Sequence, residues 1–312
     1  MYLYLVDHSS ERGQRKVLAE LLYTSYLQSY AFVGQPGFAD TQKYWGELLN
    51  IHLAGLPSQN NMIQSQILPE IESHPTTFSD KKEVEIKEKF FNDLRPRVII
   101  DSGAFTAFTT GKIINPKDYA TWSLDFQKRW EHKMKSLYFM NLDVIGNQDD
   151  SWKNQSILEL LGMNPIPIIT YGVDKRHLIR ALDNYDYIAL GGLVPHSRNK
   201  IKLQKWLDYC FNIIMGRYKE TGVIPKIHLL GITTDWVLKR YPCYSSDSSS
   251  WVSCLRFGRA SAAGLDKIPR YKESDAALSA TIHTLRSEVV KYKKMETEAT
   301  NLWKSRGIIF DD

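Results

Sequence analysis

The 312-residue sequence predicts one α/β domain, a (β/α)8 TIM-type barrel with an irregular N-terminal insertion and a long C-terminal helix. Short apolar or β-branched runs alternate with helical stretches along most of the chain, which is typical of βαβ units and a parallel sheet. These runs number about eight, the number of strands that closes such a barrel. We therefore expect a single domain over residues 1–312, with residues 54–79 inserted into it.

The N-terminal third predicts two strands around a segment without periodicity. Met1–Asp7 is expected to be a strand, because its apolar run meets an acid and lacks the basic region of a signal peptide. Helical periodicity covers Glu11–Gln28, and a second strand is expected at Tyr30–Val33. Residues 54–79 are polar and contain three prolines, which is typical of an excursion from the scaffold. Further helices are expected at 41–53 and 81–94.

From residue 98 the alternation becomes regular. Val98–Asp101 is a β-branched run that ends in an acid, the pattern of a strand buried on both faces. Further strands are expected at Leu137–Asp143, Ile166–Tyr171, Tyr187–Leu193, Lys226–Ile232 and from Cys243 towards Asp247. Helices are expected between and after them, at Pro116–Trp130, Trp152–Leu161, Lys175–Leu182, Leu203–Tyr218 and Glu273–Lys304.

Composition and charge exclude several classes of protein. The excess of 40 Lys+Arg over 35 Asp+Glu is mild, so it permits a polyanionic partner without requiring one. Three cysteines are an odd and sparse set, which predicts no disulfide framework and a reducing compartment. Cys243 and Cys254 are too far apart for a metal knuckle, and we expect neither a metal nor a cofactor. No apolar run approaches the roughly 18 residues of a membrane span, so we expect a cytoplasmic protein without a membrane partner.

Polar or glycine-rich signatures stand where the predicted strands end. Because the carboxyl ends of barrel strands converge on one mouth, we expect Asp101, Asp143 and Asp247 to share a pocket there. The pair Gly191-Gly192 would lie beside them. Two carboxylates, one nucleophile or stabiliser and one acid/base, are what cleavage of a glycosidic bond requires. The alternative for each aspartate is a structural one, as a helix cap or a turn residue.

At these strand ends the chain resembles the tRNA-guanine transglycosylase superfamily. Asp101–Phe105 resembles that family's Asp-Ser-Gly-Gly-Phe motif, and Leu142-Asp143 resembles its strand-end aspartate. Gly191-Gly192-Leu193 resembles its Gly-Gly-Leu element. His228–Ile232 is similar to its His-Leu-Met-Gly-Val strand, which an acid follows, here in Ser246–Trp251. Five motifs in the same order over about 150 residues carry the resemblance.

The chain departs from the family pattern in three ways. It lacks the Cys-x-Cys-x-x-Cys…His zinc site of the bacterial tRNA-acting members. Its Gly-Gly-Leu element continues as Val194–Ser197 in place of Ala-Val-Gly-Glu, and Tyr171 stands where glutamine is usual. A short chain without the zinc site and with Asp-Ser-Ser-Ser-Trp looks most like the phage-type DNA-guanine transglycosylases, which insert 7-deazaguanine derivatives into DNA. A phage-encoded protein of this kind would act in the host cytoplasm.

The resemblance implies a pentosyltransferase that exchanges guanine in DNA for a free 7-deazaguanine, such as 7-cyano-7-deazaguanine, through a covalent glycosyl-enzyme intermediate. In this reaction Asp247 is the nucleophile and Asp101 the general acid/base. Asp143 would face the Watson–Crick edge of the base. The alternatives are a tRNA substrate, an N-glycosidase that hydrolyses the bond, and a non-catalytic barrel subunit that binds nucleic acid. The sequence predicts no oligomeric state.

The remaining candidate residues follow from their positions near the mouth. The amides of Gly191 and Gly192 would reach the base carbonyl, and Phe105 and Tyr171 would sandwich the base, with core packing as the alternative for both rings. Ser102 and Leu193 belong to the pocket by their motifs, and His228 is expected to be a core histidine. Rim cations would hold the phosphates of a flipped-out nucleotide, or else be ordinary surface charges: Arg198, Lys200, Lys202, Arg256 and Arg259.

Overall fold

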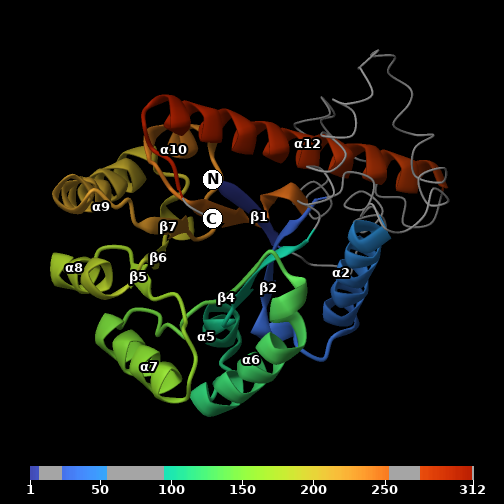
Figure 1. The fold of residues 1–312 in the computed structure, drawn as a ribbon, viewed down its shortest axis with the longest axis horizontal. Helices are drawn as coiled ribbons and strands as arrows, with labels where there is room; N and C mark the ends of the chain where they lie inside the picture. Colours follow the sequence, from blue (N-terminus) through green and yellow to red (C-terminus); the bar gives the residue numbers. More distant parts are fainter. Residues whose placement is uncertain (7–22, 55–94, 253–274, 311–312) are drawn as a thin grey trace.

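The computed structural model describes residues 1–6, 23–54, 95–252 and 275–310. Eight parallel strands alternate with helices, and the helices form a ring around the curled sheet (Figure 1). The predicted fold class, including the long C-terminal helix, is therefore confirmed. The predicted helix at 81–94, most of the insertion at 54–79, and Arg256 and Arg259 lie outside the described residues.

The first half of the barrel contains four strands. They are β1 (Tyr2–Val6), β2 (Ser25–Ser29), β3 (Arg97–Asp101) and β4 (Ser136–Phe139). The helical segments among them are η1 (Tyr30–Phe32), α2 (Pro36–Ala54), α5 (Ala104–Thr110), α6 (Pro116–Trp130) and η3 (Glu131–Lys133). The short helix α5 has no counterpart among the predicted elements.

The position predicted for the second strand is wrong. Tyr30–Val33 begins with the 3-10 turn η1, and the strand is Ser25–Ser29, at the end of the stretch predicted to be helical. All five residues of β2 are buried between β1 and β3. Its buried polar residues, such as Gln28, interrupt the apolar run by which a buried strand is recognised.

The second half of the barrel follows the predicted order. Its strands are β5 (Ile168–Thr170), β6 (Tyr187–Gly191), β7 (Lys226–Leu229) and β8 (Ser245–Ser248). The helical segments are α7 (Gln148–Leu160), α8 (Lys175–Asn184), η4 (Val194–His196), α9 (Lys200–Thr221), α10 (Asp235–Arg240), η5 (Ser250–Val252) and α12 (Asp275–Ser305). Several strands are shorter than predicted, because the last residues of each predicted stretch belong to the loop that follows the strand.

The sheet closes on itself between its two edge strands. Its order is β4-β3-β2-β1-β8-β7-β6-β5, so the first and last strands of the chain are neighbours. Beyond the end of β4, Met140 forms a parallel bridge with Ile166. Ile166 accepts a hydrogen bond from the amide of Asn141 at 2.9 Å and donates one to the carbonyl of Phe139 at 2.8 Å. The edges of the sheet therefore meet, and the barrel is joined there.

A side chain continues this seam where β4 has ended. The amide nitrogen Nε2 of Gln148 donates to the carbonyl of Ile168 at 2.8 Å, and its Oε1 accepts from the amide of Thr170 at 2.9 Å. These two groups lie on the side of β5 that faces β4. Since buried backbone groups need partners, Gln148 takes the place of the missing strand.

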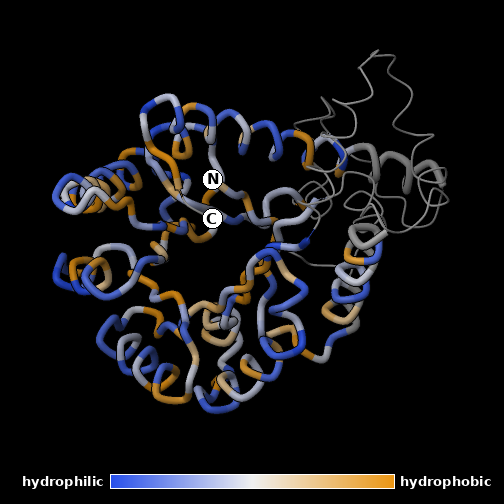
Figure 2. The backbone as a smooth tube through the Cα atoms, in the orientation of Figure 1, coloured by the Kyte–Doolittle hydropathy of each residue, from blue (hydrophilic) through white to orange (hydrophobic). Residues whose placement is uncertain are grey.

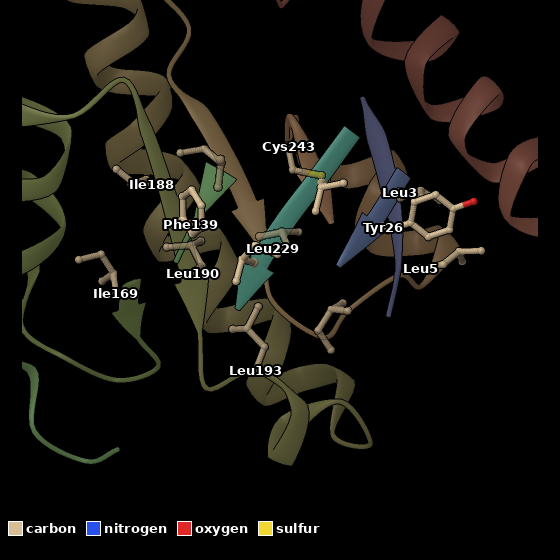
Figure 3. Close-up of a cluster of buried hydrophobic side chains, with 14 of the residues drawn as sticks. Leu3, Leu5, Tyr26, Phe139, Ile169, Ile188, Leu190, Leu193, Leu229 and Cys243 are labelled. Atoms are coloured by element: carbon tan, nitrogen blue, oxygen red, sulfur yellow. The ribbon is translucent and has the colours of Figure 1, made fainter. Parts of the chain in front are cut away.

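Strand residues alternate between two hydrophobic cores. Leu3 and Leu5 belong to the core between the sheet and the helices, part of which Figure 3 shows. Tyr4, between them in sequence, belongs to the core inside the barrel. Figure 2 shows apolar stretches along the strands and hydrophilic residues on the outward turns of α8 and α9. Ile99 of β3 also lies inside the barrel. This two-residue period directs Asp101, two positions further, into the barrel mouth.

None of the helices in the described part of the chain is long and apolar enough to cross a membrane.

Candidate active site

Asp101 ends β3 and faces the mouth of the barrel. Its Oδ2 accepts a hydrogen bond of 3.0 Å from the amide of Gly103. Gly103, and not Asp101, occupies the N-cap position of α5. Gly103 has a φ of +78°, and a Cβ there would lie 2.7 Å from Cβ of Ala31. Glycine is therefore required at this turn, which holds its amide against the carboxylate. The neighbouring Ser102 is fully buried.

Asp247 lies on β8 and is buried, with 6% of its surface exposed. One carboxylate oxygen, Oδ1, accepts two hydrogen bonds, from the amide of Gly231 at 2.8 Å and from Nε2 of His228 at 3.1 Å. Within the described part of the chain no donor lies on the other oxygen, Oδ2. Among the described residues, the carboxylate is thus held through one oxygen, Oδ1.

A buried hydrogen-bonded chain runs from Asp247 into the barrel. Nδ1 of His228 lies 2.6 Å from Oγ of Ser245, and that Oγ lies 2.6 Å from the hydroxyl of Tyr187. Because the Asp247 carboxylate only accepts, Nε2 of His228 carries a proton. Ser245 then donates to Nδ1 and accepts from Tyr187, so both ring nitrogens of His228 have a partner. His228 is buried as predicted, and it also contacts the candidate nucleophile, which the sequence did not reveal.

The loop after β4 places Asp143, and α7 holds this loop in position. Nδ2 of Asn154 donates to the carbonyl of Leu142 at 2.8 Å, and Oγ of Ser151 accepts from the amide of Val144 at 2.8 Å. The N-cap of α7 is Asn147. Asp143 is therefore not a helix cap, and its carboxyl group is left for another role.

The three aspartates form one electrostatic group with Asp101 in the middle. Burial raises the pKa of Asp101; the Gly103 amide opposes this shift and the Asp247 carboxylate adds to it. Burial, and then the charge of Asp101, raises the pKa of Asp143 to about 7. Protein atoms surround both carboxyl groups, although both side chains keep some contact with solvent. The charge of Asp101 therefore interacts with those of both Asp143 and Asp247.

The glycine pair lies at the end of β6, where close packing excludes a side chain. A Cβ on Gly191 would lie 2.7 Å from Cγ2 of Ile168. Gly192 has a φ of +68° and is exposed at the mouth. Leu193 is fully buried in the core between the sheet and the helices (Figure 3), so it packs the fold and does not line the mouth.

The two candidate base-stacking rings differ in their surroundings. Phe105, on α5, is 64% exposed and its ring is open to a ligand. Tyr171 stacks on His196 with ring centroids 3.8 Å apart and an interplanar angle of 20°, and Trp206 packs against it at 5.2 Å. The imidazole of His196 thus covers one face of Tyr171. The sequence did not single out His196, although it lies in the segment that departs from the family pattern.

The described cations on the rim lie between β6 and the first turn of α9. Arg198 and Lys202 are exposed, and Nζ of Lys200 lies 5.1 Å from the ring centroid of Trp236. These residues follow the glycine pair closely, which brings positive charge to the edge of the mouth.

A cavity of about 310 Å³ lies at the opposite end of the barrel, between the start of β1, the residue before β8 and the C-terminal segment. Its lining includes Tyr2, Tyr244 and Glu296, and none of the three aspartates. We place the candidate site at the aspartates, because chemistry in parallel barrels takes place at the carboxyl ends of the strands. Among the described residues, no group of three or more His, Cys, Asp or Glu side chains is arranged to hold a metal ion.

Comparisons with known proteins do not assign the chain to a family: no family model matches it, and no curated protein matches it significantly.

Proposed function

We propose that this protein is a guanine transglycosylase that exchanges guanine in DNA for a free 7-deazaguanine. The arrangement of the carboxylates carries the proposal. Oδ2 of Asp247 accepts no hydrogen bond from the described residues, and Asp101 has a raised pKa. A nucleophile and a proton donor with separate environments are what displacement at a glycosidic carbon needs.

In the first half-reaction Oδ2 of Asp247 attacks C1′ of the target nucleotide. The C1′–N9 bond breaks, and Asp101 gives its proton to the departing guanine. A glycosyl ester on Asp247 remains, and Asp101 is now a carboxylate. The raised pKa of Asp101 keeps a larger fraction of this group protonated near neutral pH, as a general acid requires.

In the second half-reaction Asp101 removes the N9 proton of the incoming base. That nitrogen attacks C1′, the ester bond breaks, and Asp247 regains its carboxylate. Both half-reactions use the same two groups, so the exchange needs no nucleoside triphosphate. The bonds from Gly231 and His228 to Oδ1 keep Asp247 in place while its other oxygen forms and breaks the ester.

Asp143 supplies the selectivity for guanine. Its carboxylate would accept from N1–H and from the exocyclic amine of the base, a pair of donors that adenine lacks. Because a buried acceptor pair left without donors is costly, adenine is rejected. The exposed ring of Phe105 would stack on the bound base.

The proposal is tested with purified protein, duplex DNA and labelled 7-cyano-7-deazaguanine, followed by mass spectrometry of the digested nucleosides. We expect the label in DNA and an equal release of guanine. Guanine release without added base would indicate an N-glycosidase, and label in tRNA alone would indicate the RNA substrate. Binding of both substrates without incorporation would contradict the proposal.

A matched pair of variants tests the nucleophile. Asp247→Asn should abolish both the incorporation and the covalent intermediate, while DNA binding stays close to that of the wild type. Asp125→Asn, on the outer face of α6 and paired with Arg129 at 3.1 Å, should behave as the wild type. Exchange by Asp247→Asn at the wild-type rate would show that another group attacks C1′.

A further inference from the structure

Two large apolar side chains stand in solvent on the segment that follows Asp101. Phe108 is 63% exposed, and Ile113 is 95% exposed. An isolated exposed apolar residue needs no explanation, but Phe105 lies one helical turn before Phe108 and adds a third. Three large apolar side chains thus leave the rim of the candidate site within nine residues of sequence, 105–113.

The segment that carries them is folded. Ala104 and Ala107 are buried on the inner side of α5, which packs against η1. The helix ends at Gly111, whose amide donates to the carbonyls of Ala107 and Phe108. The amide of Lys112 donates to the carbonyl of Ala107 at 2.9 Å. The exposed apolar side chains therefore project from a segment whose backbone is held by hydrogen bonds.

The charges around this segment indicate what kind of partner it meets. Residues 104–117 contain Lys112 and Lys117 and no acid, and Asp118 follows in the first turn of α6. Residues 194–206 contain four cations, Arg198, Lys200, Lys202 and Lys205, and no acid. Both stretches combine exposed apolar side chains with an excess of positive charge, which fits a partner that has apolar faces and a negatively charged backbone. Nucleic acid has this combination.

The barrel places these stretches on different sides of the mouth. Residues 104–117 follow β3 and residues 194–206 follow β6, and β4 and β5 lie between these strands on the shorter way around the barrel. Asp143 follows β4 on this shorter way, and Asp247 lies on β8, on the longer way around. A duplex lying across the mouth would be held on both sides of the reacting nucleotide.

We propose that Phe108 and Ile113 form a wedge that enters the base stack of duplex DNA beside the target nucleotide. The inference rests on the proposed function and identifies its substrate as a paired duplex that the enzyme opens itself. Removing a base from the stack leaves a gap that costs free energy, and an inserted apolar side chain offsets part of that cost. The cations across the mouth hold the backbone while the gap is open. Phe105, which is the nearest of the three to Asp101 in sequence, stacks on the extruded base.

The test compares the double variant Phe108→Ala/Ile113→Ala with the wild type on two fluorescein-labelled DNAs of the same mixed sequence. One is fully paired, and the other has an unpaired bubble around its central guanines. We expect the double variant to bind the paired duplex about tenfold or more weakly, and the bubble within about twofold of the wild type. Leu160→Ala is the control, because Leu160 is 87% exposed at the end of α7, away from the mouth.

A second readout follows base opening directly. With 2-aminopurine beside the guanines of the duplex, wild-type binding should raise the fluorescence, and the double variant should not. An equal loss of affinity for the paired duplex and for the bubble would overturn the wedge proposal, and so would unchanged affinity for both. A change of oligomeric state in the double variant, or an equal loss on single-stranded RNA, would assign the patch to self-association or to RNA and would also overturn it.

These readouts require no added base, so they separate the wedge from the exchange reaction. If the wild type opens the duplex and incorporates no label, the exchange proposal fails and the wedge stands. If wild type and double variant incorporate label equally into paired DNA, the wedge is wrong and the exchange stands. Both side chains are exposed, so the variant should fold, and its thermal midpoint provides the check.

Discussion

The imidazole of His228 and the carboxylate of Asp247 lie 3.1 Å apart on neighbouring strands of the barrel. His228 of β7 is in register with Ser245 of β8, so Asp247 lies two residues closer to the mouth on the same inward face. The histidine therefore forms hydrogen bonds to Asp247, towards the mouth, and to Ser245, directly across on β8. His228 therefore holds the candidate nucleophile from within the barrel, and the amide of Gly231, beyond the end of β7, holds the same oxygen.

Replacing His228 should slow the exchange without abolishing it. A hydrogen bond to a charged group contributes about 1.5–3 kcal/mol, which predicts a loss of roughly ten- to a hundredfold in the single-turnover rate of His228→Phe. The KM for DNA should change little, because His228 is a positioning residue that touches no substrate. His228→Gln, which keeps a donor, should recover part of the rate. Equal rates in Phe and Gln variants would show that the hydrogen bond has no such role.

The rate of guanine release should fall as the pH rises. The first half-reaction needs protonated Asp101, and its raised pKa extends that form to higher pH than for an ordinary aspartate. Asp101→Asn should remove both the activity and this dependence. The measurement is single-turnover guanine release across a series of buffers, with DNA binding followed in parallel. Residual activity in Asp101→Asn that falls with pH as in the wild type would exclude Asp101 as the acid.

Binding of the free base should strengthen as the pH rises through about 7, the pKa of Asp143. Below that value the carboxyl group is protonated and cannot accept from both donors of the base; above it, both oxygens accept. Calorimetric titration of guanine against pH measures this change. Asp143→Asn should flatten the dependence and weaken the preference for guanine over adenine. A pH-dependent affinity in that variant would assign the titration to another group.

Asp143 should also lower the free energy of unfolding of the protein above neutral pH. The pKa of Asp143 is raised in the folded protein. Its contribution to the free energy of unfolding is therefore fully present below its pKa in the unfolded chain, near 4, and is lost as the pH rises through about 7. Asp143→Asn should therefore unfold at a higher temperature than the wild type at about pH 8, by at least about 2 °C. At about pH 4 the two midpoints should converge. A thermal scan at both pH values provides the comparison.

Gly103 and Gly111 form a matched pair that separates backbone strain from packing. Both have positive φ values, +78° and +69°, but only a Cβ at Gly103 meets a neighbour, Ala31, at 2.7 Å. Gly111→Ala should cost about 1–2 kcal/mol of unfolding free energy, from strain alone. Gly103→Ala should cost about 2–4 kcal/mol, because overpacking adds to the strain. Urea unfolding measures both, and equal losses would contradict the assigned contact.

The sequence determined the fold class, and it predicted where the candidate site would lie. Alternating apolar runs and helices predicted the barrel, and strands such as Val98–Asp101 were recognisable because an unbroken β-branched run has few other uses in a soluble domain. Acids at the ends of these runs predicted Asp101, Asp143 and Asp247 at one mouth. That followed from the geometry of any parallel barrel, without knowledge of side-chain contacts.

Tertiary structure alone decided β2, whose buried Gln28 and Ser29 hide the strand pattern. It also decided the chain from Asp247 through His228 and Ser245 to Tyr187, because these contacts join strands whose register no local pattern reveals. Local periodicity reports which way a residue faces within its own strand. Which residue it meets across the barrel depends on how the strands are staggered, and that is a property of the closed sheet.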